Sequence, residues 1–135
     1  MSRGFRVWDN QAKSYDCDRE FVLSPNGNLM ELCSNHNGIW DYHFADEDRF
    51  IVERDTGLKD ANGKRICEGD IVKVTKWVYD ENLGHEEIVH ITKISWWGRY
   101  AQFGTDYSDN LSDEITEDFY EVIGNIHENK ELLEN

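Results

Sequence analysis

Short runs of hydrophobic and β-branched residues alternate with polar turn residues along most of this chain. Within several runs apolar and polar positions alternate with a period of two, which is typical of β-strands. The runs that predict strands are residues 5–8, 21–23, 29–33, 40–44, 50–53, 71–79, 87–97, 99–103 and 119–126, with a further short strand near Tyr15. The pattern therefore predicts a mainly β fold that is nearly free of helix.

Turn residues divide these strands into hairpins. Residues 25–28, Pro-Asn-Gly-Asn, contain an Asn-Gly pair, which supplies the positive φ angles that a tight turn requires. Residues 60–64 form a second predicted turn, with Gly63 at a left-handed position. Residues 68–70 form a third turn, which leads into the strand that begins at Ile71. These turns make the centre of the chain its best-defined region.

The last third of the chain combines an acidic segment with a short helical turn. Residues 107–117 are polar and acidic, and we expect a loop there, because loops of this length are often mobile or bind partners. After the last strand, Asn129 is a predicted N-cap for one helical turn over residues 130–134. Leu132 and Leu133 would dock this turn on the body of the protein.

Three segments, in this order, resemble the YopX-like family of bacteriophage and prophage proteins. They are FRVWD at residues 5–9, TGLKDANGKRICEGDIV at residues 56–72 and VIGNIHENKELL at residues 122–133. The chain departs from the family pattern at Lys130, where such sequences often carry Pro, and at Cys67, where an aromatic residue is more usual.

The resemblance implies a mainly β fold built around an SH3-like barrel, with additional N-terminal strands and a short C-terminal helical turn. It implies a single YopX-like domain over residues 1–135, with N-terminal β hairpins in 1–55 and the SH3-like barrel portion in 56–135. It also implies a phage or prophage origin. The resemblance assigns no activity, because the biochemical role of the family is not settled.

Charge narrows the range of partners. The net charge is −14, and residues 106–135 hold ten of the 28 acidic side chains but only one Lys. Nucleic-acid binding depends on Lys and Arg that displace counterions from phosphates, so this charge disfavours nucleic acid as a partner. A local patch of Lys73, Lys76 and Lys93 is the exception that we keep open. A basic surface of a host protein would be attracted to this acidic chain. The simpler interpretation is that the acidic residues only keep the protein soluble.

Cysteine usage and hydropathy indicate the compartment. The three cysteines, Cys17, Cys33 and Cys67, are odd in number and widely spaced, which favours reduced thiols over a disulfide framework. Residues 1–10 lack the apolar run of a signal peptide, and no stretch approaches the roughly 20 apolar residues of a membrane span. We therefore expect a cytoplasmic protein of a bacterial host cell, with no membrane partner.

No arrangement of residues predicts a catalytic, metal or cofactor site. Cys33 and His36 have a ligand-like spacing but no second pair, and His85 and His90 lack the HExxH order. The glycines of the central segment have no phosphate-binding motif around them. We therefore expect no cofactor and no enzyme, and keep an uncharacterised enzyme as an alternative.

Glu68 and Asp70 flank Gly69 and could bind a cation or act as acid and base. The simpler interpretation, which we favour, is that Asp70 accepts hydrogen bonds from its own turn.

An aromatic group and the acidic loop form the candidate interaction surface. Its members are Trp77, Trp96, Trp97, Tyr100, Asp109, Asp113 and Glu114. We interpret the aromatic group as mainly core, with one of the adjacent Trp96 and Trp97 facing outward because neighbours on a strand point to opposite faces. The leading hypothesis is an accessory protein that contacts a host protein. The alternative is a self-assembling structural protein, with a second copy as the partner.

Overall fold

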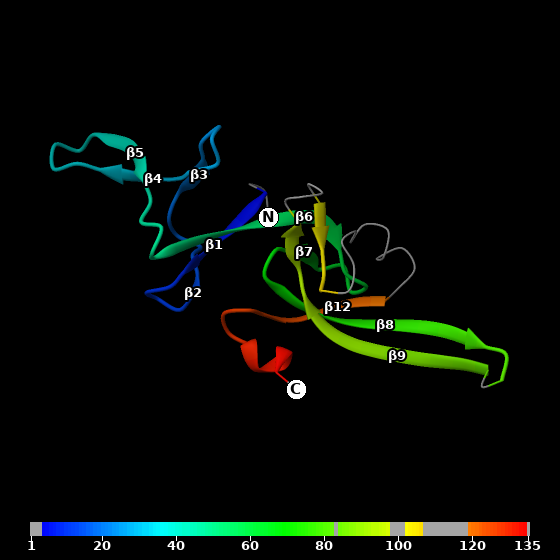
Figure 1. Cartoon of the computed structure of the whole chain (residues 1–135). Helices are drawn as coiled ribbons and strands as arrows, with labels where there is room; N and C mark the ends of the chain where they lie inside the picture. The colour runs from blue at the N-terminus through cyan, green and yellow to red at the C-terminus, as the bar shows by residue number, and fades with distance from the viewer. Residues whose placement is uncertain (1–3, 83, 98–101, 107–118, 135) are drawn as a thin grey trace. The chain divides into compact units, whose positions relative to one another are not determined.

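A computed structural model describes residues 4–82, 84–97, 102–106 and 119–134, with the side chain of Trp97 excluded (Figure 1). The described chain is mostly β-strand, which confirms the predicted class. It divides into two compact units, residues 1–54 and 55–135. Strand β6 (Phe50–Lys59) contributes its first half to unit 1 and its second half to unit 2. No described helix has the length and apolar character needed to cross a membrane.

Unit 1 contains two antiparallel sheets. In the first, β1 (Phe5–Asp9) pairs with β2 (Ser14–Tyr15) on one side and with residues 50–54 of β6 on the other. In the second, the strand order is β3 (Phe21–Leu23), β4 (Leu29–Ser34), β5 (Trp40–Phe44). The predicted 25–28 turn joins β3 to β4, with Gly27 at φ 85°.

One hydrophobic core joins the two sheets of unit 1. Its buried members are Phe5, Val7, Phe21, Ala45 and Phe50. The rings of Phe21 and Phe50 meet edge to face with centroids 5.1 Å apart, a favourable aromatic geometry. Since Phe21 belongs to β3 and Phe50 to β6, this contact packs the second sheet on the first.

Unit 2 is organised around its longest strands. The sheet order is β12 (Phe119–Asn125), β8 (Asp70–Asp80), β9 (Gly84–Lys93), with a bulge in β12 between Val122 and Gly124. β10 (Ser95–Trp97) pairs with β11 (Gln102–Gly104), and β7 (Arg65–Cys67) pairs with the end of β6. The core packs side chains of β7, β8 and β12 with Ile94, which lies between β9 and β10: Ile66, Val72, Val74, Ile94 and Tyr120 are all at most 2% exposed.

Buried aspartates close the central turns. Asp60 is 7% exposed, and its Oδ1 accepts hydrogen bonds from the backbone N–H groups of Asn62 and Lys64 at 2.9 and 2.8 Å. Gly63 follows at φ 82°, as the turn requires. Asp70 is 2% exposed and accepts the backbone N–H of Cys67 at 2.8 Å. The turn-closing interpretation of Asp70 is therefore confirmed.

The C-terminal helical turn forms, but its cap differs from the prediction. A 3₁₀ turn spans Lys130–Leu133, and the Asn129 side chain makes no cap hydrogen bond to it. Asn129 Oδ1 instead accepts the backbone N–H of Asn125 at 3.2 Å, next to the bulge in β12. Asn129 therefore occupies the predicted N-cap position, but its side-chain oxygen binds the strand-end amide of Asn125 and not the helical turn.

Several strand boundaries also differ from the sequence predictions. β6 extends six residues past the expected end at Glu53, because residues 55–59 find a second partner in β7. The expected strand 87–97 is two strands with a break at Ile94, whose N–H bonds to Asp70 O. The expected loop 107–117 lies outside the described residues. The SH3-like barrel, and the single domain with its boundary at residue 55, stay predictions.

We expect Ile66→Ala to lower the free energy of unfolding by about 2–5 kcal/mol, because the substitution opens a cavity in the core of unit 2. The matched control is Ile88→Ala, since Ile88 is 43% exposed and should change stability by less than about 1 kcal/mol. Urea unfolding followed by circular dichroism measures both. Equal losses in the two variants would contradict the assigned core.

Candidate functional site

The outer half of the β8–β9 hairpin holds most of the exposed large apolar side chains among the described residues of unit 2. Phe119, where the described part of β12 begins, pairs with Thr75 of β8, and beyond this point β8 pairs with β9 alone among the described residues. Residues 76–82 and 84–89, which we name the arm, extend as a two-stranded ribbon beyond the three-stranded part of the sheet (Figure 1). Most of these residues are exposed.

One face of the arm is aromatic. Trp77 and Tyr79 lie two residues apart on β8, so their side chains share a face, and they are 60% and 65% exposed. Val89 of β9 and Phe119 of β12 are both opposite Thr75 and therefore belong to the same face. The rings of Trp77 and Phe119 meet edge to face with centroids 6.4 Å apart. The aromatic face therefore continues from the arm onto the base of the sheet.

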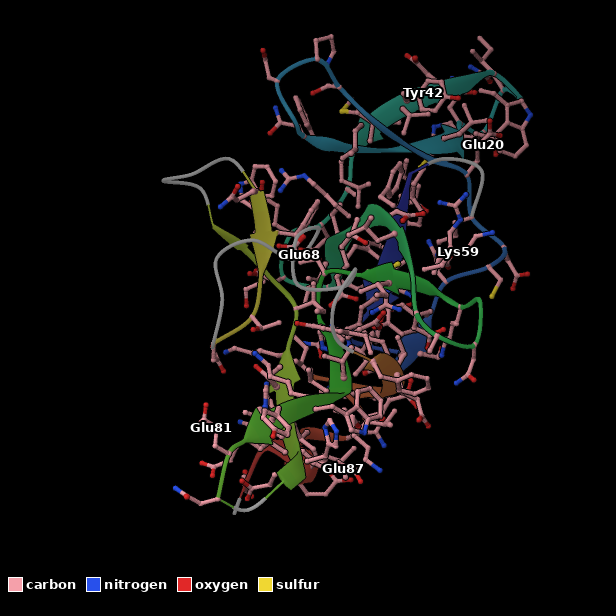
Figure 2. All side chains as sticks on the ribbon, turned by 90° about the vertical axis from the view of Figure 1, so that its right-hand side faces the viewer. Glu20, Tyr42, Lys59, Glu68, Glu81 and Glu87 are labelled. Carbon is pink, nitrogen blue, oxygen red and sulfur yellow. The ribbon has the colours of Figure 1, made fainter. Side chains whose placement is uncertain are left out.

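Polar groups border this aromatic face. Glu87 pairs with Trp77 across the strands, and His85 pairs with Tyr79, with ring centroids 5.2 Å apart. Glu81 lies at the turn of the arm, and Figure 2 shows Glu81 and Glu87 at the same end of unit 2. The opposite face carries the exposed Val78 and Ile88. The arm thus exposes apolar side chains on both faces, with acidic groups around them.

The remaining predicted surface residues are only partly described. Trp96 is 40% exposed, and its ring meets Phe103, its partner on β11, at 4.9 Å. Trp77 and Trp96 therefore lie in different sheets with different ring partners. The interpretation as core is wrong for Trp77, whereas the exposed Trp96 agrees with the expectation that one of Trp96 and Trp97 faces outward. The side chain of Trp97, and all of Tyr100, Asp109, Asp113 and Glu114, lie outside the described residues.

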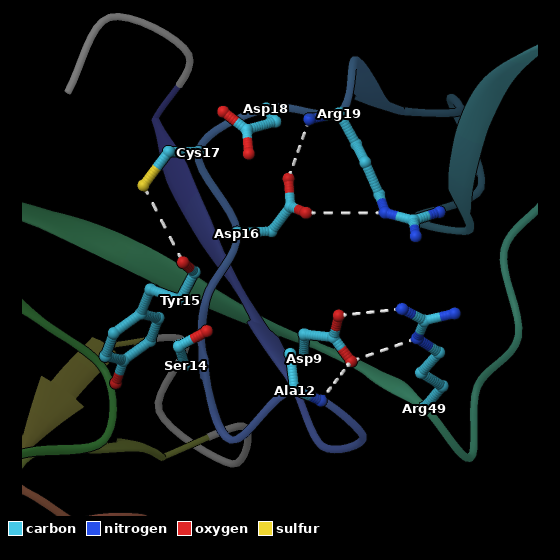
Figure 3. A pocket seen from close by; sticks show the side chains of 9 residues that line it. All are labelled: Asp9, Ala12, Ser14, Tyr15, Asp16, Cys17, Asp18, Arg19 and Arg49. Carbon is cyan, nitrogen blue, oxygen red and sulfur yellow. Dashed lines mark hydrogen bonds and ion pairs between the residues drawn. The ribbon is translucent and has the colours of Figure 1, made fainter.

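The sequence interpretation missed a pocket in unit 1. It has a volume of about 510 Å³. Figure 3 shows the nine residues that line it: Asp9, Ala12, Ser14, Tyr15, Asp16, Cys17, Asp18, Arg19 and Arg49. Asp9 ends β1 and is 4% exposed. Its carboxylate accepts hydrogen bonds from Nε and one terminal nitrogen of Arg49, at 3.0 and 2.9 Å, and from the backbone N–H groups of Gln11 and Ala12.

The electrostatics of this pocket follow from that bidentate pair. The hydrogen bonds from Arg49 are the main cause that holds the pKa of Asp9 far below its usual range, and burial opposes them. The same pair raises the pKa of Arg49. The Arg49 guanidinium also lies over the buried ring of Phe50, 4.7 Å from its centroid. Asp9 and Arg49 therefore stay charged and bound to each other.

A second ion pair completes the wall of the pocket. Arg19 contacts Asp16 at 3.4 Å and Glu31 at 2.6 Å. Both arginines thus have carboxylate partners, and the Cys17 thiol donates to the Tyr15 carbonyl oxygen at 3.7 Å. This pairing holds the β1–β2 turn against β6 and β4. Because the arginines and their carboxylate partners bind one another, the pairing serves stability more than it prepares a side chain for catalysis. A sequence signal was available only in part, because Asp9 ends the FRVWD segment while its partner lies 40 residues away.

Metal binding has no visible centre in the described ranges. Within residues 4–82, 84–97, 102–106 and 119–134, no three His, Cys, Asp or Glu side chains are grouped so that they could hold a metal ion. The cysteines among these residues are all free thiols.

Comparison with known proteins identifies the class of this chain. The YopX protein family matches residues 4–134, nearly the full length. The chain therefore belongs to the YopX family. No curated protein matches it.

Two solved structures are similar to the chain over almost all of their length. One is protein EF1440 from Enterococcus faecalis, with 28% sequence identity, a TM-score of 0.59 and 97% of each chain covered. The other is protein yopX from Bacillus subtilis, with 18% identity, a TM-score of 0.53 and coverage of 99% of this chain and 100% of that one. At 18% identity, the similarity to yopX shows the fold alone.

The Asp9–Arg49 pair predicts a specific acid sensitivity. Because the pKa of Asp9 is lower in the folded state than in the unfolded state, the unfolded state binds more protons at acidic pH. The stabilisation is present above the unfolded pKa of about 4 and is lost as the pH falls below it. We expect Asp9→Asn to be less stable than the unmodified protein at pH 7 and to lose less stability between pH 5 and pH 3.

Urea unfolding at several pH values measures this difference. Asp18→Asn is the matched control, because Asp18 lines the same pocket but is exposed. If the pH profile of Asp9→Asn paralleled that of the unmodified protein, the pair would not carry the acid sensitivity.

Proposed function

We propose that this protein is a non-enzymatic phage or prophage accessory protein that binds a host protein in the bacterial cytoplasm through the arm of unit 2. The observation that carries the proposal is the aromatic face of the arm, with Trp77 and Tyr79 each at least 60% exposed. The phage setting rests on the resemblance of the three sequence segments to YopX-like phage and prophage proteins. The match to the YopX family agrees with that resemblance.

The arm has the chemistry of a binding surface. An isolated two-stranded ribbon is only marginally stable in water, so apolar groups on both of its faces gain from being covered. Trp and Tyr are the residue types most enriched among those that dominate binding energies. Val89 and Phe119 enlarge the aromatic face to a continuous apolar patch, and patches of this kind mark interaction sites.

Charge specifies the partner further. Glu81, Glu86 and Glu87 surround the apolar residues of the arm, and the chain as a whole has a net charge of −14. A partner with an apolar groove bordered by Lys or Arg would therefore fit, and its approach would be accelerated electrostatically. We propose the same steering role for Asp109, Asp113 and Glu114 of the acidic segment.

The alternatives have different support. The non-enzymatic part of the proposal is supported by the pocket of unit 1, where Asp9 binds Arg49 and Asp16 binds Arg19. The alternative to a non-enzymatic protein is an uncharacterised enzyme. Self-assembly, the second candidate, is favoured by a different observation, the open edge of β5 in unit 1. Nucleic acid stays disfavoured by the charge of the chain.

We expect Trp77→Ala to weaken binding of the partner at least about tenfold, because truncation removes a central aromatic anchor. The experiment is to express the tagged protein in a bacterial host, crosslink it and identify the captured protein by mass spectrometry. The purified partner is then titrated with each variant by calorimetry, and circular dichroism checks that the fold is unchanged.

Trp40→Ala is the matched control, since Trp40 is 65% exposed but belongs to unit 1. Its affinity for the partner should equal that of the unmodified protein. Recovery of the bait alone, or equal affinities for Trp77→Ala and the unmodified protein, would contradict the proposal.

A further inference from the structure

Strand β5 exposes the largest aromatic side chains of unit 1. It is the edge strand in the order β3-β4-β5, and all five of its residues are exposed. Trp40 is 65% exposed, Tyr42 is 39% and Phe44 is 74%. These three residues alternate along the strand and therefore share one face of the sheet.

This aromatic face is the outer face of the sheet. Directly paired residues lie on the same face, and Phe44 pairs with Met30, which pairs with Val22. The opposite face contains Phe21, which is buried in the core of unit 1. Figure 2 shows Tyr42 beside Glu20, whose Oε1 accepts the Tyr42 hydroxyl at 3.3 Å. The core therefore covers the inner face at Phe21 and Leu29, while the aromatic row lies on the opposite face.

No strand in the described part of the chain pairs with the outer edge of β5. Asn35 N–H bonds to Ile39 O, and Ala45 N–H bonds to Leu29 O. Because hydrogen-bonding direction alternates along an antiparallel strand, the odd-numbered residues of β5 bond to β4. The N–H and C=O groups of Trp40, Tyr42 and Phe44 therefore point to the outer edge. The Tyr42 N–H bonds there only to the neighbouring Asp41 carboxylate, at 2.8 Å.

Apart from Asp41 on the inner face, the sequence of β5 has none of the usual features that protect an edge strand. Natural edge strands are commonly blocked by Lys, Pro, a bulge or inward charges. The segment 39–44, Ile-Trp-Asp-Tyr-His-Phe, has no Lys and no Pro, and its register with β4 is free of bulges. The edge strand of unit 2, β9, instead carries Glu86, Glu87 and Lys93.

We propose that two copies of this chain pair through β5, antiparallel and centred on Tyr42, so that the two three-stranded sheets become one six-stranded sheet. A two-fold axis at Tyr42 places Trp40 of each copy opposite Phe44 of the other. The outward N–H and C=O groups of these residues are then the hydrogen-bonding pairs of the new ladder.

The sequence of β5 is complementary to itself in this register. Asp41 of one copy lies opposite His43 of the other, twice, so a carboxylate meets an imidazole at both positions. On the outer face, the six aromatic rings form three pairs across the two neighbouring β5 strands. Aromatic cross-strand pairs are among the side-chain pairs that stabilise sheets. A symmetric dimer requires the same patch on both subunits, and a self-complementary strand supplies it. A register shifted by two residues would lose both Asp–His pairs.

This pairing goes beyond the proposed function and is independent of it, because β5 belongs to unit 1 and the arm to unit 2. A dimer could form in a protein whose arm binds nothing, and the arm could act in a monomer.

Charge exchange tests the register directly. His43→Glu places like charges opposite Asp41 in both halves of the dimer, and Asp41→Lys places a cation opposite His43. We expect each variant alone to dimerise about tenfold more weakly than the unmodified protein. An equimolar mixture of the two variants restores complementarity at both positions, so we expect the mixture to regain the dimer as a heterodimer.

Sedimentation velocity from about 1 to about 100 µM measures the association, which must depend on concentration. Circular dichroism verifies the fold of each variant, and Trp77→Ala is the control that should dimerise normally. A monomer throughout this range would overturn the proposal. So would a dimer that both single variants retain, or a mixture that associates no better than the variants alone.

Discussion

Unit 2 depends most on the hydrogen bonds that the buried carboxylate of Asp60 accepts. This side chain is 7% exposed and accepts three backbone N–H groups, those of Asn62, Lys64 and Val122. Two of these close the turn before β7, and the third, at 2.9 Å, belongs to β12, 62 residues further along the chain. A buried N–H without a partner is costly, so one side chain fixes both a local turn and the position of the last strand.

The same device recurs at other turns. Asp70 closes the turn between β7 and β8 by accepting the Cys67 N–H, and Asp9 closes the turn after β1 while it binds Arg49. With carboxylates satisfying the turns, each unit needs only a small hydrophobic core. The chain nevertheless contains 13% aromatic residues, more than these cores hold. Among the described residues, much of the surplus lies on the arm and on the outer face of β5, which are the two surfaces that we propose as binding surfaces.

The strands and turns could be predicted from the sequence because their signals are local. Alternating residues specify strands such as β1 and β4, and Gly27 and Gly63 mark turns at positive φ. Pairing between distant segments carries no local signal, so β1 beside β6, and Asp9 beside Arg49, became visible only in the structure. A period of two also tells which side chains share a face but not which face is covered. Trp77 was therefore interpreted as core although its face is open.

The most direct test of this account is to compare Asp60→Ala with Asp80→Ala by amide hydrogen exchange and urea unfolding. Both aspartates accept an N–H two residues on at a hairpin turn, but of the two only Asp60 is buried and reaches β12. We expect Asp60→Ala to lose at least about 2 kcal/mol of stability and the exchange protection of Val122, and Asp80→Ala to lose less than about 1 kcal/mol. Equal losses, or a protected Val122 amide in Asp60→Ala, would contradict the central role of the buried carboxylate.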